Sequence, residues 1–204
     1  MKLFKTFENI AKNSHSAKEW IAAEAEISKK TQPFISKEER LAMLKERYGS
    51  GQARWNSKLR IVATSIEDIE RQVFDENSNV DILVALQASG ALQGVWPSVE
   101  INGKHFFDGG SFSMENPDVV VDADKMLVLS TGLPVDVPYK LEDLLAQLEK
   151  KGTETSLVLP SEKTMNILKD FNYNMVEAKI RPFVAQAGRE QGQAEAALIK
   201  ERWL

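Results

Sequence analysis

The spacing of apolar residues changes from a helical to a strand-like period after about residue 50. In residues 1–50 the apolar positions recur every three to four residues, which predicts helices. Ser16 and Ser36, each followed three residues later by a glutamate, match the capping box and predict two helix starts. Gly49 is placed to end the second of these helices. The expected first helix has one apolar face, formed by Leu3, Phe4, Phe7, Ile10 and Ala11.

From residue 51 onward short runs of β-branched residues alternate with helical patterns. Strands are predicted at 59–64, 72–74, 99–101, 104–107, 125–130 and 155–160, and helices at 81–88, 141–148, 161–171 and 175–189. Asn102-Gly103 suits a two-residue type I′ turn and predicts a hairpin. Such alternation predicts an α/β fold with a largely parallel sheet and one antiparallel hairpin. The residues of the last helix expected to face inward are Ile180, Phe183, Val184 and Ala187.

Length and composition indicate one structural unit, with a helical N-terminal segment (1–50) and an α/β part (51–204). The chain has 30 acidic and 26 basic residues, and its basic residues are scattered, so nucleic acid is not an expected partner. No apolar run approaches the length of a membrane span, and the cytoplasm is the default location. The apolar face of the first helix has two readings: packing on the core, which we favour, or peripheral contact with a membrane.

The sequence lacks the motifs that mark several kinds of catalytic site. The two histidines, His15 and His105, belong to no metal-ligand spacing, and cysteine is absent, so no metal centre is predicted. Phosphate-binding glycine motifs are not found, nor is a G-x-S-x-G elbow. Ser89 lacks the leading glycine of that elbow and follows a predicted helix, which favours a packing role. His105 reads as a half-buried strand residue.

Asp108 is the strongest chemical candidate. It ends a predicted strand, where α/β sheets place their ligands, and Gly109 and Gly110 follow it. Two glycines allow close approach by another group and permit positive φ. A carboxylate in this position can deprotonate a nearby hydroxyl, although an Asp-Gly-Gly sequence taken alone is more often a turn.

Three stretches, in this order and spacing, resemble the patatin-like phospholipase family. They are 85–97 (ALQASGALQGVWP), 99–110 (VEINGKHFFDGG) and 115–118 (ENPD). The resemblance covers about residues 59–131, with a further likeness at 181–192 (RPFVAQAGREQG). Gln93 and Ser98 stand where the family usually has proline.

The resemblance implies a three-layer α/β sandwich, with a mostly parallel sheet between helices, and a serine acyl hydrolase that acts on lipid esters. It implies that Asp108 is the base of a Ser-Asp dyad, that Gly109, Gly110 and Asn116 support it, and that no cofactor is needed. The glycine-rich oxyanion loop and the nucleophile-bearing strands of the family have no counterpart in this sequence. Strand edges and apolar surface are therefore expected to be exposed.

Three explanations remain open at this stage. The chain is a fragment of a split or longer hydrolase, it is completed by an N-terminal fragment or by another copy of itself, or its N-terminal helices cover the gap. The corresponding functions are an acyl hydrolase with only its aspartate half present, or a non-catalytic patatin-like scaffold that binds a partner or ligand. The isolated chain is expected to show no esterase turnover.

Overall fold

The N-terminal segment is helical, as predicted. The computed structural model describes residues 2–49, 51–132, 140–174 and 177–203. Its first three elements are α1 (Lys2–Asn13), α2 (Ala17–Lys30) and α3 (Lys37–Tyr48). The capping box at Ser36 is complete, whereas at α2 the Glu19 carboxylate accepts from the His15 N–H, one residue before the capping serine. Gly49 ends α3 with φ +77°.

The larger sheet has four strands in the order β2-β1-β4-β3, and every neighbouring pair is antiparallel. The strands are β1 (Ile61–Ser65), β2 (Arg71–Phe74), β3 (Val99–Ile101) and β4 (Lys104–Asp108). The prediction of a mostly parallel sheet is therefore wrong for this sheet. Tight connections join β1 to β2 and β3 to β4, and such connections can only join antiparallel strands. At Asn102-Gly103 both φ values are positive, as a type I′ turn requires.

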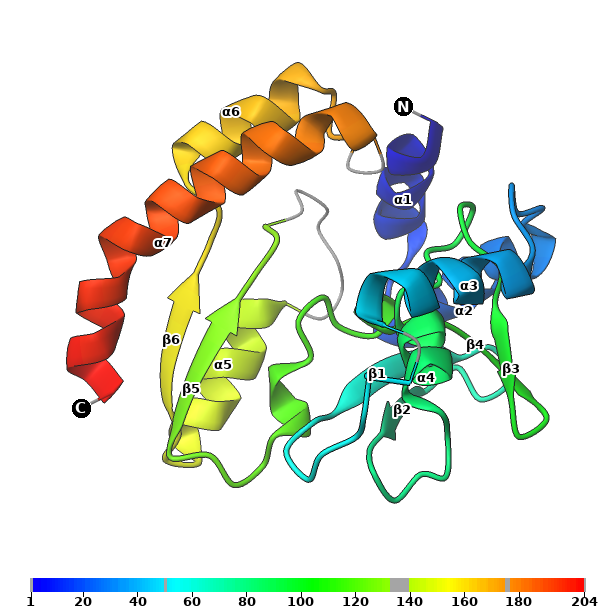
Figure 1. The fold of residues 1–204 in the computed structure, drawn as a ribbon, viewed down its shortest axis with the longest axis horizontal. Helices are drawn as coiled ribbons and strands as arrows, with labels where there is room; N and C mark the ends of the chain where they lie inside the picture. The colour runs from blue at the N-terminus through cyan, green and yellow to red at the C-terminus, as the bar shows by residue number, and fades with distance from the viewer. Residues whose placement is uncertain (1, 50, 133–139, 175–176, 204) are drawn as a thin grey trace.

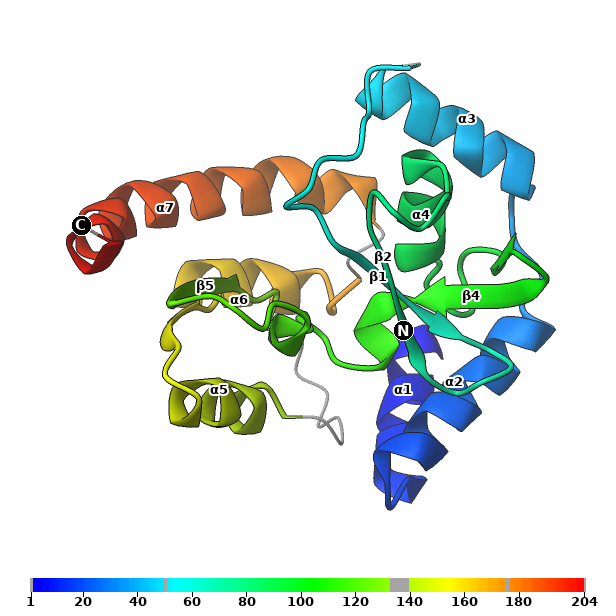
Figure 2. The ribbon, with the colours of Figure 1, turned by 90° about the horizontal axis from the view of Figure 1, so that it is seen from below.

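The two faces of this sheet bury different residues. Phe106 packs on the side of α4 (Ile82–Ser89), and Phe107 on the side of α1 and α2. Figure 2 shows α4 on one side of the sheet and α1 with α2 on the other. Phe106 and Phe107 reach different clusters because successive residues of a strand point to opposite faces.

The first helix packs on the core. Phe7, Ile10 and Ala11 are partly buried against the cluster that contains Trp20 and Phe107, as we expected from their spacing. The side chains of Leu3 and Phe4 lie outside the described residues. Among the described helices, none is both long enough and apolar enough to cross a membrane.

A second, smaller sheet is parallel, as predicted for this part of the chain. It contains β5 (Lys125–Leu129) and β6 (Glu154–Val158), joined through α5 (Leu141–Lys150). Its small apolar cluster consists of Met126, Val128, Leu145 and Leu148. Leu129, Leu157 and Leu159 are exposed.

Two helices complete the chain: α6 (Glu162–Asp170), capped by Ser161, and α7 (Arg181–Trp203), which Figure 1 shows side by side. The 3₁₀ turn η3 (Ala178–Ile180) precedes α7, and Met175, the expected start of this helix, lies outside the described residues. Ile180 and Ala187 are buried as predicted, but Phe183 is 54% exposed and its predicted inward orientation is wrong. Its ring reaches Phe171 at the end of α6, at the margin of the helix pair.

Candidate functional site

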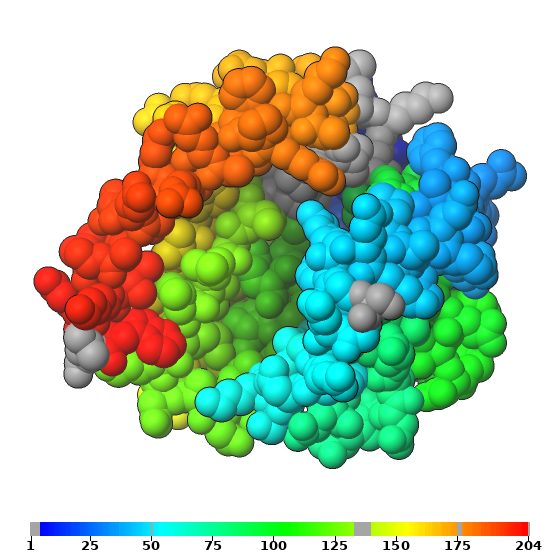
Figure 3. Space-filling view, viewed as in Figure 1, coloured from blue at the N-terminus to red at the C-terminus, as the bar shows by residue number. Residues whose placement is uncertain are grey.

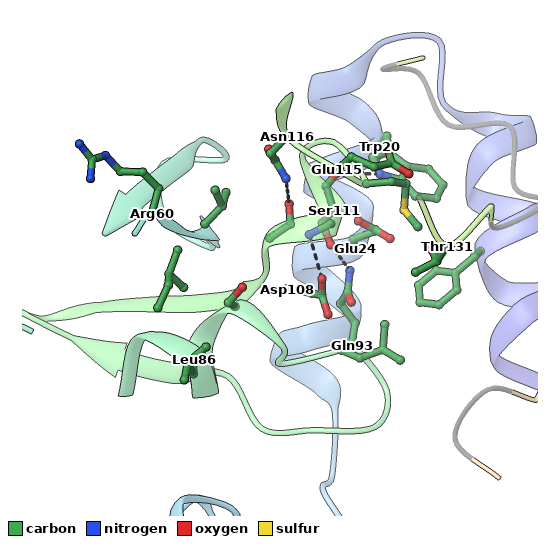
Figure 4. A pocket seen from close by; sticks show the side chains of 18 of the residues that line it. Trp20, Glu24, Arg60, Leu86, Gln93, Asp108, Ser111, Glu115, Asn116 and Thr131 are labelled. Carbon is green, nitrogen blue, oxygen red and sulfur yellow. Dashed lines mark hydrogen bonds between the residues drawn. The ribbon is translucent and has the colours of Figure 1, made fainter. Parts of the chain in front are cut away.

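A cavity of about 650 Å³ lies beside the end of β4. Its wall combines the two parts of the chain, with α1 and α2 on one side and the start of β1, α4 and the loop after β4 on the other. Figure 3 shows the molecular surface hollowed between the segment before β1 and β5. Figure 4 shows the side chains that line the cavity, with Asp108, Glu24, Gln93 and Ser111 close to one another. Most of the remaining wall is apolar.

Asp108 is the last residue of β4, as the sequence predicted, and its backbone is fixed on both sides. Its N–H donates to the Ala91 carbonyl at 3.3 Å, and its carbonyl accepts from Thr64 Oγ1 at 2.9 Å. Its carboxylate accepts from the Gly110 N–H through Oδ1 at 2.8 Å. Within the described residues this is the only hydrogen bond that the Asp108 carboxylate makes with the protein.

Burial raises the pKa of the Asp108 carboxyl to about 6, while the Gly110 N–H and the positive charge of Arg40 oppose that rise. Arg40 comes from α3, donates to the Gly90 carbonyl, and stacks on Trp96 with its guanidinium carbon 4.6 Å from the ring centroid. Burial lowers the pKa of Arg40 itself to about 10, so it stays charged at neutral pH. Asp108 is thus an ionised base at pH 7 whose proton affinity is higher than that of an exposed aspartate.

The two glycines after Asp108 serve close packing. Although glycine permits positive φ, neither of these two has it, and both belong to the 3₁₀ turn η1 (Gly109–Ser111). A Cβ at Gly109 would lie 2.2 Å from the Val62 carbonyl oxygen, and one at Gly110 would lie 3.0 Å from Asp108 Oδ1. The chain must cross over β1 as soon as β4 ends, and only glycine leaves room for that crossing.

Asn116 supports the loop that follows η1 and lines the cavity. It is buried, has φ 49°, and donates from Nδ2 to the Gly109 carbonyl at 3.0 Å and to the Ser113 carbonyl. Its Oδ1 accepts from Arg71 at 3.2 Å. Arg71 in turn holds Asp118 through two hydrogen bonds of 2.7 and 2.8 Å. The predicted motif residues 108, 109, 110 and 116 therefore come together in one place.

Sequence reasoning missed a second carboxyl group in this cavity. Glu24, on α2, is only 3% exposed, and its Oε2 has no hydrogen-bond partner. Burial raises the pKa of Glu24 to about 8, hydrogen bonds with Ser111 and Gln93 oppose the rise, and the nearby Asp108 charge adds to it. The sequence did contain a sign that Glu24 is buried. It lies four residues after Trp20 and three after Ile21, on the apolar face of the helix.

Gln93 and Ser111 are hydrogen-bonded to each other beside Glu24. Gln93 Nε2 donates to Ser111 Oγ at 2.5 Å, and the Ser111 carbonyl accepts from Trp20 Nε1 at 3.0 Å. Gln93 is almost fully buried, and its Oε1 has no partner. Gln93 is therefore part of the cavity's polar wall.

Other candidate groups take no part in chemistry at Asp108. Ser89 lies on the cavity wall, yet among the described residues no serine or threonine hydroxyl donates to the Asp108 carboxylate. His105 pairs through Nδ1 with Glu67 at 2.9 Å on the hairpin. In the described part of the chain, no group of three or more metal-ligating side chains is found.

Comparison with known proteins adds no relative. No protein-family profile matches the chain, and no curated protein matches its sequence. The cavity and the residues that line it are therefore the features of the chain that indicate a function.

Proposed function

We propose that the cavity beside Asp108 binds the acyl part of a lipid ester, and that Asp108 is the base of a patatin-like Ser-Asp dyad. The observation that carries this proposal is the meeting of one ionised carboxylate with a largely apolar cavity of about 650 Å³. Cavities of roughly 300–1,000 Å³ with apolar walls and a few polar groups are typical of small-molecule sites. Phe7, Leu86 and Met114 supply apolar wall suited to a hydrocarbon chain.

In the complete dyad, a serine hydroxyl would transfer its proton to Asp108 while its oxygen attacks the ester carbonyl carbon. The alcohol would then leave, and water would hydrolyse the acyl-serine. The Asp108 carboxylate receives no hydroxyl from the described residues, so we propose that a nucleophile comes from an N-terminal fragment or a second copy of the chain. We propose no role for a metal or an organic cofactor.

The same geometry supports a second function, in which the chain binds an acyl lipid and does not hydrolyse it. No described hydroxyl group donates to the Asp108 carboxylate. This favours the binding function for the chain alone. We propose that the 204-residue chain by itself is a binding module, since no hydroxyl of the described residues is hydrogen-bonded to its Asp108 carboxylate. The parent patatin-like fold also stays a proposal, supported by the helices on both faces of the sheet and by the position of Asp108.

Two measurements test these proposals. Binding is measured with the methyl ester of dansylaminoundecanoic acid, an uncharged probe whose fluorescence rises in apolar surroundings. Met114→Trp, which narrows the cavity, should weaken binding, whereas Leu198→Trp, at an exposed position of α7, should not. Equal binding by both variants, or no binding by the native chain, would refute the acyl-binding proposal.

Catalysis is measured with an alkyl fluorophosphonate, which labels activated serines, and with p-nitrophenyl butyrate. We expect neither labelling nor turnover above background in the isolated chain, and no effect of Asp108→Ala on that background. Labelling of the native chain would show that a serine is activated within it and would exclude the binding-only reading.

A further inference from the structure

The buried carboxyl group of Glu24 has one oxygen, Oε2, to which no group of the described residues is hydrogen-bonded. Its side chain is 3% exposed, points into the cavity from α2 (Figure 4), and forms no ion pair among the described residues. A buried carboxyl that serves stability normally has a cation or several donors around it. Ser111 and Gln93 are hydrogen-bonded to the Glu24 carboxyl group, but its Oε2 has no partner, and neither does Oε1 of the neighbouring Gln93.

The charges around Glu24 favour its neutral form. Asp108, on β4, is the charged group that acts on it directly, and this charge disfavours a second negative charge nearby. The other charged residues of the wall are Arg60, before β1, and Glu115, in the loop after η1. Among the described side chains, α1 contributes Phe7 alone to the wall and α4 contributes uncharged residues. Arg40 of α3 acts on Asp108. Because burial and Asp108 raise the pKa of Glu24 to about 8, it holds its proton at pH 7.

We infer that Glu24 donates a hydrogen bond to the carbonyl oxygen of an uncharged acyl ester held in the cavity. The inference rests on the proposed acyl-binding function and specifies the ligand class. A neutral carboxyl group supplies one O–H donor, and the cavity places that donor beside the base Asp108. An ionised fatty acid fits less well, because its carboxylate would stand close to the Asp108 charge. Glu24 thus selects the ester over ligands that have no acceptor there.

The direct test compares 1-monolauroylglycerol with 1-O-dodecylglycerol, which has the same chain length but an ether in place of the ester. Binding of monomeric ligand is followed by tryptophan fluorescence, since Trp20 lines the cavity. At pH 6.5 we expect the native chain to prefer the ester by about five- to tenfold, the range that one net hydrogen bond gives. Glu24→Leu should remove this preference, so that the variant binds the ester and the ether with equal affinity. Glu26→Leu, at an exposed position of the same helix, is the matched control and should keep it.

A pH series gives an independent readout that does not depend on the folding of the leucine variant. In the native chain the ester preference should disappear as the pH rises through about 8, because Glu24 loses its proton there. Glu24→Gln keeps a donor that does not titrate, so its preference should persist at pH 9.5.

The outcomes separate the two proposals. If the native chain binds neither glycerolipid, the acyl-binding function fails and this inference fails with it. If both lipids bind equally, or if the ester preference survives in Glu24→Leu, acyl binding stands and the role of Glu24 is refuted. A preference in the native chain that does not change between pH 6.5 and 9.5 refutes it as well.

Discussion

Gly109 lies against Val62 so closely that a methyl group on the glycine would stand 2.2 Å from the Val62 carbonyl oxygen. This contact fixes the distance between the turn after β4 and the neighbouring strand β1. Because Asp108 directly precedes Gly109 and pairs with Ala63 in the register of the sheet, the same contact sets where the Asp108 carboxylate enters the cavity.

Gly109→Ala should destabilise the chain by about 3 kcal/mol, since a backbone carbonyl cannot move aside for the new methyl group. The free energy of unfolding in urea measures this loss. Gly188→Ala, in α7, is the control: nothing lies within 4 Å of its Cβ position, and alanine should stabilise the helix by about 0.5–1 kcal/mol. A Gly109→Ala chain as stable as the native one would show that β4 and β1 do not approach so closely.

Asn116 combines a left-handed backbone conformation with side-chain hydrogen bonds, and two substitutions separate these contributions. Asn116→Gly loses the bonds to the Gly109 and Ser113 carbonyls, whereas Asn116→Ala also strains the backbone at φ 49°. Alanine should therefore be less stable than glycine by about 1 kcal/mol. Thermal unfolding of the two variants gives the difference, and an alanine variant at least as stable as the glycine variant would contradict the backbone assignment.

The stability of the chain should fall as the pH rises from about 4.5 to 8 because of Glu24. Its pKa is about 8 in the folded chain, above the ordinary glutamate value of 4.5, so the folded state holds a proton that the unfolded state releases. Glu24→Gln cannot titrate, and it should match the native chain at pH 4 and exceed it by a few kcal/mol at pH 9. Urea unfolding at a series of pH values measures this.

The control for that experiment is Glu26→Gln. Glu26 is exposed, and Lys29 lowers its pKa, so removing its charge should not produce a gain at high pH. If the native chain and Glu24→Gln had parallel stability profiles, Glu24 would have to be ionised in the folded state near neutral pH.

Arg40 should hold the pKa of Asp108 below the value that burial alone would give. In Arg40→Met the carboxyl should titrate above about 6, because the opposing positive charge is gone. Arg40→Lys retains the charge while losing the planar contact with Trp96, and it should leave the titration nearly unchanged. Carbon-13 NMR of the Asp108 carboxyl measures both values; an unchanged pKa in Arg40→Met would remove Arg40 from the electrostatics of the cavity.

The features that could be predicted from the sequence are those that depend on neighbouring residues. The Asn102-Gly103 turn and the caps at Ser36 and Ser161 are local, because each joins groups a few residues apart. The relative direction of the strands in the larger sheet does not depend on neighbouring residues alone. Its strands β1 and β4 pair across more than forty residues, and alternation of strands and helices suggested parallel neighbours where the structure has antiparallel ones.

In the candidate site, too, some residues could be predicted from their neighbours in the sequence and others could not. Asp108 was found because a carboxylate at a strand end, followed by two glycines, is visible in the sequence. The sequence could not show why position 109 requires glycine, because the group that a side chain there would meet is the Val62 carbonyl of another strand. Glu24 was not found because it reaches the cavity from a helix that the matched motif does not include, although its position on the apolar face of α2 marked it as unusual.

The separate apolar cluster of the β5–β6 pair has a consequence for hydrogen exchange. With four buried residues of its own, this unit can open while the antiparallel sheet stays folded, so its amide hydrogens will exchange with solvent sooner than those of β1 and β4. Thr131, just after β5, belongs to the same cavity wall as Asp108. A ligand that contacts both Thr131 and Asp108 will slow hydrogen exchange in β5 as well. Slower exchange in β5 will therefore show that the cavity is occupied.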